Sequence, residues 1–207
     1  RARVHVDGSG AIRVFDDNKP FVAVISDIDD TIVHTYVTDK KRMAGAVMFK
    51  NGDSSDPIAG AATAYTKAQA AGVDAFFYVS ASPLAWHPRL VEFLRAHGFP
   101  KGAVLLKRIG HDPITDQQGY KLARLEPLLA ALPQMRVVLV GDTGERDPET
   151  YAELRKRHPD RVVGIVIKRT PHSDVRPARF VDMTVVDEPY PDDAVAHFVL
   201  RTDASQH

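Results

Sequence analysis

The segment that most constrains this chain is FVAVISDIDDT, residues 21–31, in which an apolar run leads into alternating acidic residues. The run from Phe21 to Ile25 is typical of a strand buried on both faces of a parallel sheet. Asp27, Asp29 and Thr31 follow where that strand is expected to end. Open α/β sheets bind ligands at the carboxyl ends of their strands, so these carboxylates could share a cation or a phosphoryl group. The alternative is an acidic turn without function, since Asp is common in turns.

Apolar runs alternate with helical patterns along the rest of the chain, which predicts an α/β fold with a parallel sheet. The expected segments are strands at 74–80, 104–106, 136–141, 162–167 and 180–186, and helices at 56–72, 84–97, 120–131, 147–158 and 191–201. Asp56 and Pro57 are expected at the N-cap and first position of the first helix.

The N-terminal segment, residues 1–19, contains Val-rich alternation around Asp-Gly-Ser-Gly within residues 3–15, which predicts a β-hairpin. An isolated hairpin is marginally stable, so it either packs on the main domain, residues 20–207, or is the remnant of an upstream domain. The chain begins at Arg1 and not at Met, so the native N-terminus could be missing and an exported form is not excluded.

Composition excludes several classes of function. Lysine and arginine together number 27, as do aspartate and glutamate, so the net charge is zero and no nucleic-acid partner is expected. The absence of cysteine excludes disulfides, thiolate metal sites and a catalytic thiol. No run approaches the 18 apolar residues of a membrane span. We expect a cytoplasmic protein or one peripheral at a membrane, and the oligomeric state stays open.

Three further signals lie where later elements meet loops. Ser80 ends the strand 74–80, where its hydroxyl could bind a phosphate oxygen or belong to an ordinary turn. Asp142 follows the strand 136–141 and would add a third acidic ligand for magnesium, which prefers oxygen ligands. Asp147, five residues later, either reaches the same site through a water molecule or caps a helix.

Lys121 lies at the start of the predicted helix before that strand. Its ammonium could neutralise the repulsion between a nucleophilic aspartate and an incoming phosphate. An ordinary solvated lysine is the alternative, and Lys107 is the nearest rival for the same role.

Taken in chain order, these signals group into four motifs that resemble those of the haloacid dehalogenase (HAD) superfamily of phosphatases. They are Asp27-x-Asp29-x-Thr31, Ser80, Lys121, and Gly141-Asp142 with Asp147. The strings SDIDDTIVHT, YVSASP, GFPKG and GDTGERDPETYAE are similar to the catalytic domain of the actin-patch-protein type of phosphatidate phosphatase. The resemblance covers residues 20 to 170. It implies a Rossmann-like HAD fold with helices on both faces of the sheet and a minimal cap.

The resemblance also implies a mechanism. Asp27 attacks phosphorus and forms an aspartyl-phosphate, while Asp29 protonates the leaving group and then activates water. The carboxylate of Asp27, the backbone carbonyl of Asp29 and Asp142 would hold Mg²⁺. Thr31 would orient Asp29 or its loop.

The remaining expectations concern the substrate. Ser80, Ala81, Lys121 and His34 are the predicted substrate-binding residues. The insertion at 35–73 is too short for a large lid, so the site should be open to large substrates. The basic and apolar segment 40–50 is either a flap that touches a lipid surface or an ordinary packed hairpin.

The expected activity is hydrolysis of phosphatidate or a related lipid phosphate. The alternatives are a phosphatase for a soluble or macromolecular ester, and a phosphate-binding module without catalysis.

Overall fold

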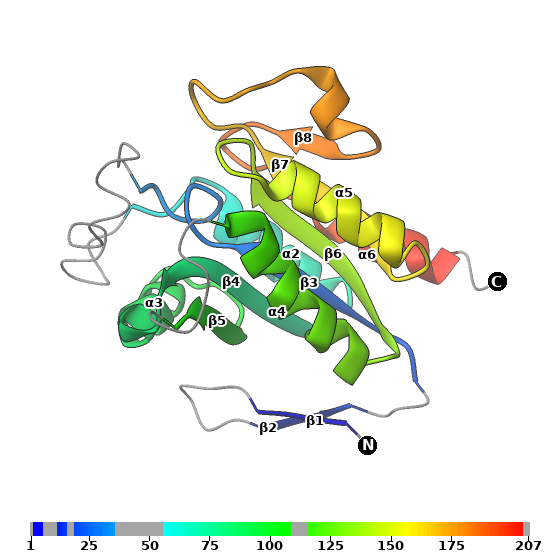
Figure 1. The fold of residues 1–207 in the computed structure, drawn as a ribbon. Helices are drawn as coiled ribbons and strands as arrows, with labels where there is room; N and C mark the ends of the chain where they lie inside the picture. Colours follow the sequence, from blue (N-terminus) through cyan, green and yellow to red (C-terminus); the bar gives the residue numbers. More distant parts are fainter. Residues whose placement is uncertain (1, 6–11, 16–18, 36–55, 109–115, 205–207) are drawn as a thin grey trace.

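The computed structural model describes residues 2–5, 12–15, 19–35, 56–108 and 116–204. Its centre is a six-stranded sheet in which all neighbouring strands run parallel, in the order β5-β4-β3-β6-β7-β8 (Figure 1). The strands are β3 Phe21–Asp27, β4 Ala75–Pro83, β5 Ala103–Lys107, β6 Met135–Asp142, β7 Val162–Lys168 and β8 Thr184–Val186. The predicted α/β class and parallel sheet are therefore confirmed.

Helices cover both faces of this sheet. The helices are α2 Ala61–Ala70, α3 His87–Ala96, α4 Gln117–Ala131, α5 Asp147–Arg157 and α6 Ala196–Ala204, with 3₁₀ turns η1 Leu84–Trp86 and η2 Pro177–Phe180. Helices α2, α3 and α6 pack on one face, and α4 and α5 pack on the other, where they cross in front of the sheet in Figure 1. Each face has its own buried apolar cluster, because successive residues of a strand point to opposite faces.

The direction of the chain across the sheet reverses at β3. From β3 the chain adds β4 and β5 on one side, and it then crosses to add β6, β7 and β8 on the other side. Ligands of open α/β sheets bind at such a switch point, in the crevice beyond the carboxyl ends of the strands. The ends of β3, β4 and β6 therefore define where a site is expected.

The first predicted helix does not begin at Asp56. Pro57 forms a bridge with Val33, and α2 starts only at Ala61, after Gly60 at the N-cap with φ of 79°. A side chain at Gly60 would bring its Cβ within 2.6 Å of the carbonyl oxygen of Tyr190, whose backbone N–H donates to the carbonyl of Ala59. This close approach by a distant segment delays the helix, and Asp-Pro alone did not reveal it.

The C-terminal elements also differ from the predicted boundaries. The segment 180–186 divides into the end of η2 and the three-residue strand β8, because Met183 closes a turn on Phe180 and Asp182 has φ of 56°. The last helix, α6, begins at Ala196, five residues after the predicted start at Pro191.

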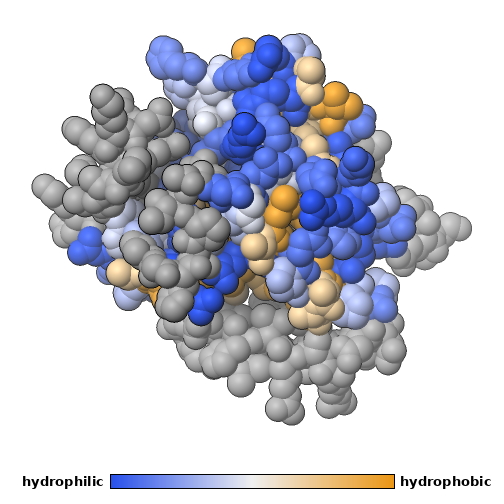
Figure 2. Space-filling view, in the orientation of Figure 1, coloured by the Kyte–Doolittle hydropathy of each residue, from blue (hydrophilic) through white to orange (hydrophobic). Residues whose placement is uncertain are grey.

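The predicted N-terminal hairpin is present as β1 Ala2–His5 and β2 Ile12–Phe15, which pair antiparallel. Its origin as a remnant of another domain stays a prediction, as does the minimal cap. The proposed flap 40–50 lies outside the described residues, as does most of the insertion that contains it. Within the described part of the chain, no helix combines the length and apolar character needed to cross a bilayer. The face seen in Figure 2 is mostly polar, with small separate apolar groups.

Candidate active site

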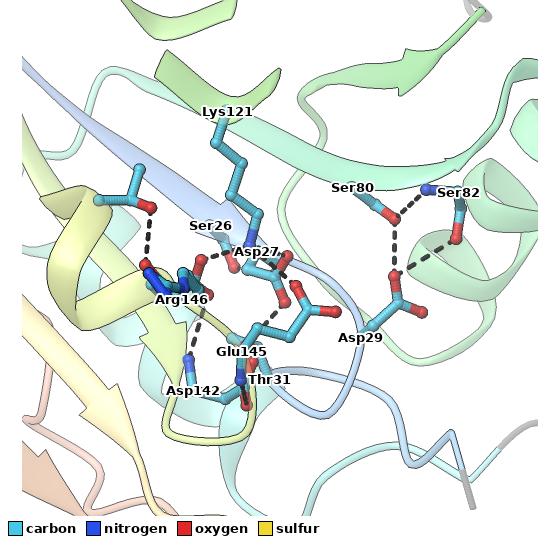
Figure 3. A network of polar contacts seen from close by, with 12 residues as sticks. Ser26, Asp27, Asp29, Thr31, Ser80, Ser82, Lys121, Asp142, Glu145 and Arg146 are labelled. Carbon is cyan, nitrogen blue, oxygen red and sulfur yellow. Dashed lines mark hydrogen bonds and ion pairs between the residues drawn. The ribbon is translucent and has the colours of Figure 1, made fainter. Parts of the chain in front are cut away.

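The carboxyl ends of three neighbouring strands bring the predicted residues together. Asp27 ends β3, Ser80 lies near the end of β4 and Asp142 ends β6. Lys121 reaches toward Asp27 from helix α4 (Figure 3). The predicted and observed positions agree because strands alternate with helices, and the last residues of neighbouring parallel strands then lie at the same end of the sheet.

Two side chains fix the carboxylate of Asp27, which is 1% exposed. The Nζ atom of Lys121 donates to Oδ1 over 2.7 Å, and the hydroxyl of Thr31 donates to Oδ2 over 3.0 Å. Thr31 therefore orients Asp27, whereas the sequence led us to expect a role toward Asp29 or its loop. Asp27 lies at the centre of the site with a fixed orientation.

Lys121 is 2% exposed and is surrounded by carboxylates. Besides Asp27, its ammonium contacts Asp147 through a short hydrogen bond and Glu145 over 3.5 Å. Lys107, the rival from sequence, instead lies 5.2 Å from the ring centre of Tyr120. The structure thus brings Lys121 to Asp27, and it places Lys121 in the second turn of a helix that begins at Gln117, earlier than predicted.

Three buried acids form a group that could hold a metal ion. Asp27, Asp142 and Asp147 each contribute a carboxylate oxygen, and these atoms lie within 4.8 Å of one another. Asp147 does not cap its helix, because Arg146 occupies the N-cap and the Oδ2 atom of Asp147 accepts the backbone N–H of Asp142 over 3.3 Å. Asp29 was a predicted metal residue through its backbone carbonyl, and its carboxylate is not in this group.

The turn after β6 depends on Gly141. A Cβ built on Gly141 would lie 2.7 Å from the Cβ of Asp147, so a larger residue would displace that acid. One oxygen of Asp142, Oδ1, accepts the backbone N–H groups of Gly144 and Glu145 over 2.5 and 3.3 Å. Its other oxygen, Oδ2, is buried and has no hydrogen-bond partner among the described residues.

Burial and crowding perturb the ionisation of the whole group. Burial raises the pKa of Asp27, Asp142 and Asp147, and the mutual repulsion of the acids adds to this effect. Burial alone would lower the pKa of Lys121, but the carboxylates of Asp147, Asp27 and Glu145 raise it well above its usual value. Lys121 therefore stays charged, and it can compensate only one negative charge, so ionisation of the further acids is unfavourable without another cation.

Asp29 belongs to a second, adjacent group of polar residues. The hydroxyl of Ser80 donates to Oδ2 of Asp29 over 2.7 Å, and that of Ser82 donates to the same oxygen over 3.3 Å (Figure 3). Ser80 also accepts the backbone N–H of Ser82 over 2.9 Å. In this structure Ser80 therefore orients Asp29, and a contact between Ser80 and phosphate would require the hydroxyl to turn.

The other predicted residues lie at the margin of the site. His34 contacts the carboxylate of Glu188 over 3.0 Å. Ala81 is half-buried between the two serines of β4. Asp30 has a structural role, because its Oδ1 atom accepts both the N–H and the hydroxyl of Thr35.

Sequence reasoning missed four polar residues around the site. Ser82 could have been found, since it follows Ser80 on the same face of a strand. Lys168 ends the apolar run of β7 in the way that Asp142 ends β6. Glu145 lies between Asp142 and Asp147 in the sequence, and no function was predicted for it. Arg179 carries no local signal, although it donates to the carbonyl oxygens of Thr143 and Glu145 over 3.1 and 3.0 Å.

Comparison with known proteins adds a family to this geometry. Residues 22–169 match the family described as the catalytic domain of phosphatidate phosphatase APP1. Phosphatidate phosphatase APP1 of Saccharomyces cerevisiae is 34% identical over 152 residues, which are 71% of this chain and 26% of that protein. An uncharacterized protein of Schizosaccharomyces pombe is 28% identical over 151 residues, or 71% of this chain and 25% of that one. The chain thus spans about a quarter of the length of these curated relatives.

A similar fold is present in a chain of the solved Pnkp1/Rnl/Hen1 complex. The TM-score is 0.50 at 14% identity, and the match covers 84% of this chain and 48% of that chain. At this identity the likeness concerns the fold alone.

Proposed function

Because this chain belongs to the family of the phosphatidate phosphatase APP1 catalytic domain, we propose that it is a magnesium-dependent phosphomonoesterase for phosphatidate or a related lipid phosphate. One observation carries the proposal: the buried carboxylate of Asp27 is held by Lys121 within a group of acids that could bind a metal ion. A positioned carboxylate nucleophile, a fixed cation and a metal site are the components of phosphoryl transfer through an aspartyl-phosphate.

The acids suit a hard divalent cation. Asp142 has a buried oxygen without a hydrogen-bond partner in the described structure, and burial raises the pKa of all three acids. Mg²⁺ prefers such oxygen ligands together with water and phosphate oxygens. Asp27, Asp142 and Asp147 would hold the ion, with the Asp29 carbonyl as a further ligand. A bound Mg²⁺ would draw negative charge from the phosphoryl oxygens.

The proposed reaction has two steps. A carboxylate oxygen of Asp27 forms a bond to phosphorus as the bond to the leaving alkoxide breaks, and protonated Asp29 gives its proton to that alkoxide. Asp29 then takes a proton from the water that attacks the aspartyl-phosphate, which releases inorganic phosphate and restores both acids. Thr31 and Lys121 would hold Asp27 in position during both steps, a role that their hydrogen bonds to its carboxylate support.

Phosphate release from two substrates tests the proposal. Short-chain phosphatidate in mixed micelles and para-nitrophenyl phosphate are compared with Mg²⁺ present, using wild type and Asp27→Asn. We expect hydrolysis by wild type, a preference for phosphatidate, and no turnover by a folded Asp27→Asn variant. Turnover by Asp27→Asn at the wild-type rate would refute the nucleophile. Activity on the small ester alone would favour a soluble substrate, and Mg²⁺ binding without hydrolysis of either ester would favour a binding module.

The segment 40–50 is proposed as the lipid contact, on the basis of its interleaved basic and apolar residues. Simultaneous replacement of Lys40, Lys41 and Arg42 by Glu should abolish binding to phosphatidate-containing vesicles while para-nitrophenyl phosphate hydrolysis persists. Unchanged vesicle binding would remove this segment from the lipid assignment.

A further inference from the structure

Lys168 is a buried lysine that the proposed mechanism does not use. It is the last residue of β7 and only 2% exposed, and its ammonium forms no hydrogen bond or ion pair with any described residue. The other buried lysines of the described structure, Lys121 and Lys107, have clear partners, since Lys121 contacts three carboxylates and Lys107 lies over an aromatic ring. Most of the residue is withdrawn from water and its ammonium pairs with no described carboxylate, so an anion that reached this ammonium would bind favourably.

The register of the sheet places Lys168 beside the acid group. Lys168 is the Cα partner of Asp142 on β6 and of Val186 on β8. Adjacent strands lie ~4.8 Å apart. Val140 and Val166, two residues before the members of this pair, both belong to the core cluster of the α2 face. Because side chains alternate along a strand, the side chains of Asp142 and Lys168 are expected on this same face of the sheet. Both residues lie at the carboxyl ends of their strands, where the site is.

Glu188 experiences the charge of Lys168 without forming an ion pair with it. Burial would raise the pKa of Glu188, but hydrogen bonds from Ala59 and His34 and the charges of His34 and Lys168 lower it. The Oε1 atom of Glu188 accepts the Ala59 N–H over 2.8 Å and contacts His34 over 3.0 Å. This carboxylate is therefore held by other groups.

Lys121 has no spare donor for a phosphate. An ammonium has three N–H bonds, and Lys121 directs hydrogen bonds to the three carboxylates of Asp27, Asp147 and Glu145. A dianionic phosphate that approaches Asp27 therefore needs positive charge from elsewhere as well as from a metal ion. Among the described residues, Lys168 is a buried lysine at the carboxyl ends of the strands that forms no ion pair.

We propose that Lys168 is an anion-binding residue that holds the phosphate group of the substrate and, after hydrolysis, inorganic phosphate. This inference rests on the proposed function, because it assigns Lys168 to the phosphate that Asp27 attacks. Its role is electrostatic binding, so its loss acts on affinity for phosphate more than on the chemical steps.

Calorimetric titration of inorganic phosphate, with Mg²⁺ present, tests the site on wild type, Lys168→Met and Lys156→Met. Lys156 is an exposed residue of α5, so Lys156→Met removes the same charge from the surface. We expect phosphate binding to weaken about tenfold or more in Lys168→Met, as for loss of a charged hydrogen bond, and to stay unchanged in Lys156→Met. The KM for the hydrolysed ester should rise similarly while kcat changes little, and Lys168→Arg should retain most of the affinity.

A purely structural role predicts a different pattern. Lys168→Met would then lower the unfolding temperature and leave the phosphate affinity and KM of the folded protein as in wild type, which would overturn the proposal. Failure of wild type to bind phosphate would also overturn it. If wild type binds phosphate through Lys168 but hydrolyses no ester, the anion site stands and the proposed phosphatase activity fails.

Discussion

The hydroxyl of Ser80 donates a hydrogen bond of 2.7 Å to Oδ2 of Asp29. A serine hydroxyl has one proton, so Ser80 cannot donate to a phosphate while it donates to Asp29. If a bound phosphate accepted the hydrogen bond from Ser80 instead, Asp29 would lose this bond and could turn toward the leaving group. The pair thus links arrival of the substrate to availability of the proposed acid.

Replacing the two serines of β4 should give unequal losses. Ser80→Ala removes a bond of 2.7 Å to Asp29 and the proposed contact with phosphate, so we expect kcat/KM to fall roughly 100-fold, as for oxyanion donors. Ser82→Ala removes a bond of 3.3 Å, which is long for a hydroxyl donor, and should cost less than about tenfold. Steady-state kinetics with para-nitrophenyl phosphate measures both, and a larger loss in Ser82→Ala would contradict this ranking.

Asp142→Asn should stabilise the metal-free protein at neutral pH. Burial and nearby acids raise the pKa of Asp142 in the folded state, so ionisation destabilises the native protein as the pH rises through this pKa. Asn keeps the acceptor for the Gly144 N–H and removes the charge. We expect the free energy of unfolding to increase by about 1 kcal/mol or more at pH 7, and the gain to vanish near pH 4.

Urea unfolding with a chelator present, from pH 4 to 8, measures this gain. Addition of Mg²⁺ should stabilise wild type and have little effect on Asp142→Asn, because only wild type retains the full group of acids. A metal-free wild type that is more stable than Asp142→Asn at pH 7 would show that the repulsion is compensated in another way.

Gly141→Ala should damage the site more than the fold. The added Cβ would collide with the side chain of Asp147, which contacts Lys121 and belongs to the acid group. We expect Mg²⁺ affinity and activity to fall at least tenfold, with a loss of about 1–3 kcal/mol in unfolding free energy, typical of overpacking.

Gly98→Ala is the matched control for this change. Gly98 has φ of 74° but no atom within 4 Å of its would-be Cβ, so the substitution strains only the backbone. It should destabilise the protein by about 1 kcal/mol and leave Mg²⁺ affinity unchanged. Equal effects of the two substitutions on Mg²⁺ affinity, by calorimetry, would refute the steric explanation.

Arg179 should act as a positioning residue for the acid-bearing loop, residues 142–147, which joins β6 to α5. Its guanidinium donates to the carbonyls of Thr143 and Glu145 and is held by Glu149 over 2.7 Å. Arg179→Gln removes the guanidinium and these hydrogen bonds. We therefore expect Mg²⁺ affinity to fall about tenfold, in line with residues that orient metal ligands.

Arg155→Gln is the comparison for Arg179. Arg155 donates to the carbonyls of Val181 and Asp182, close in sequence to Arg179, but in the described structure no hydrogen bond joins it to the acid-bearing loop. Its loss should change stability and not Mg²⁺ affinity. If both variants bind Mg²⁺ alike in calorimetric titrations, Arg179 serves only the fold.

The sequence predicted those parts of the site that lie directly at strand ends. Asp27, Ser80 and Asp142 each follow an apolar run, and the parallel sheet then brings them together. The sequence favours Lys121 over Lys107 because of its place before the strand that ends at Asp142, and the hydrogen bond of Lys121 to Asp27 also depends on the direction in which α4 crosses the sheet.

Contacts between distant segments were not predictable in the same way. The late start of α2 results from the approach of Tyr190 to Gly60, and the contact of Thr31 with Asp27 depends on how the chain folds back after β3. Arg179 reaches its loop from more than thirty residues away. Such long-range contacts leave no signal in the local sequence pattern.

The approach of Tyr190 to Gly60 has a consequence for choosing an expression boundary. The family match stops at residue 169, yet Tyr190 is buried, donates to the carbonyl of Thr31 over 3.3 Å and packs with α6 over α2. A fragment cut at the end of the match would retain every proposed catalytic acid but lose the cover over one side of its core. The segment by which this family is recognised is therefore shorter than the segment that has to fold.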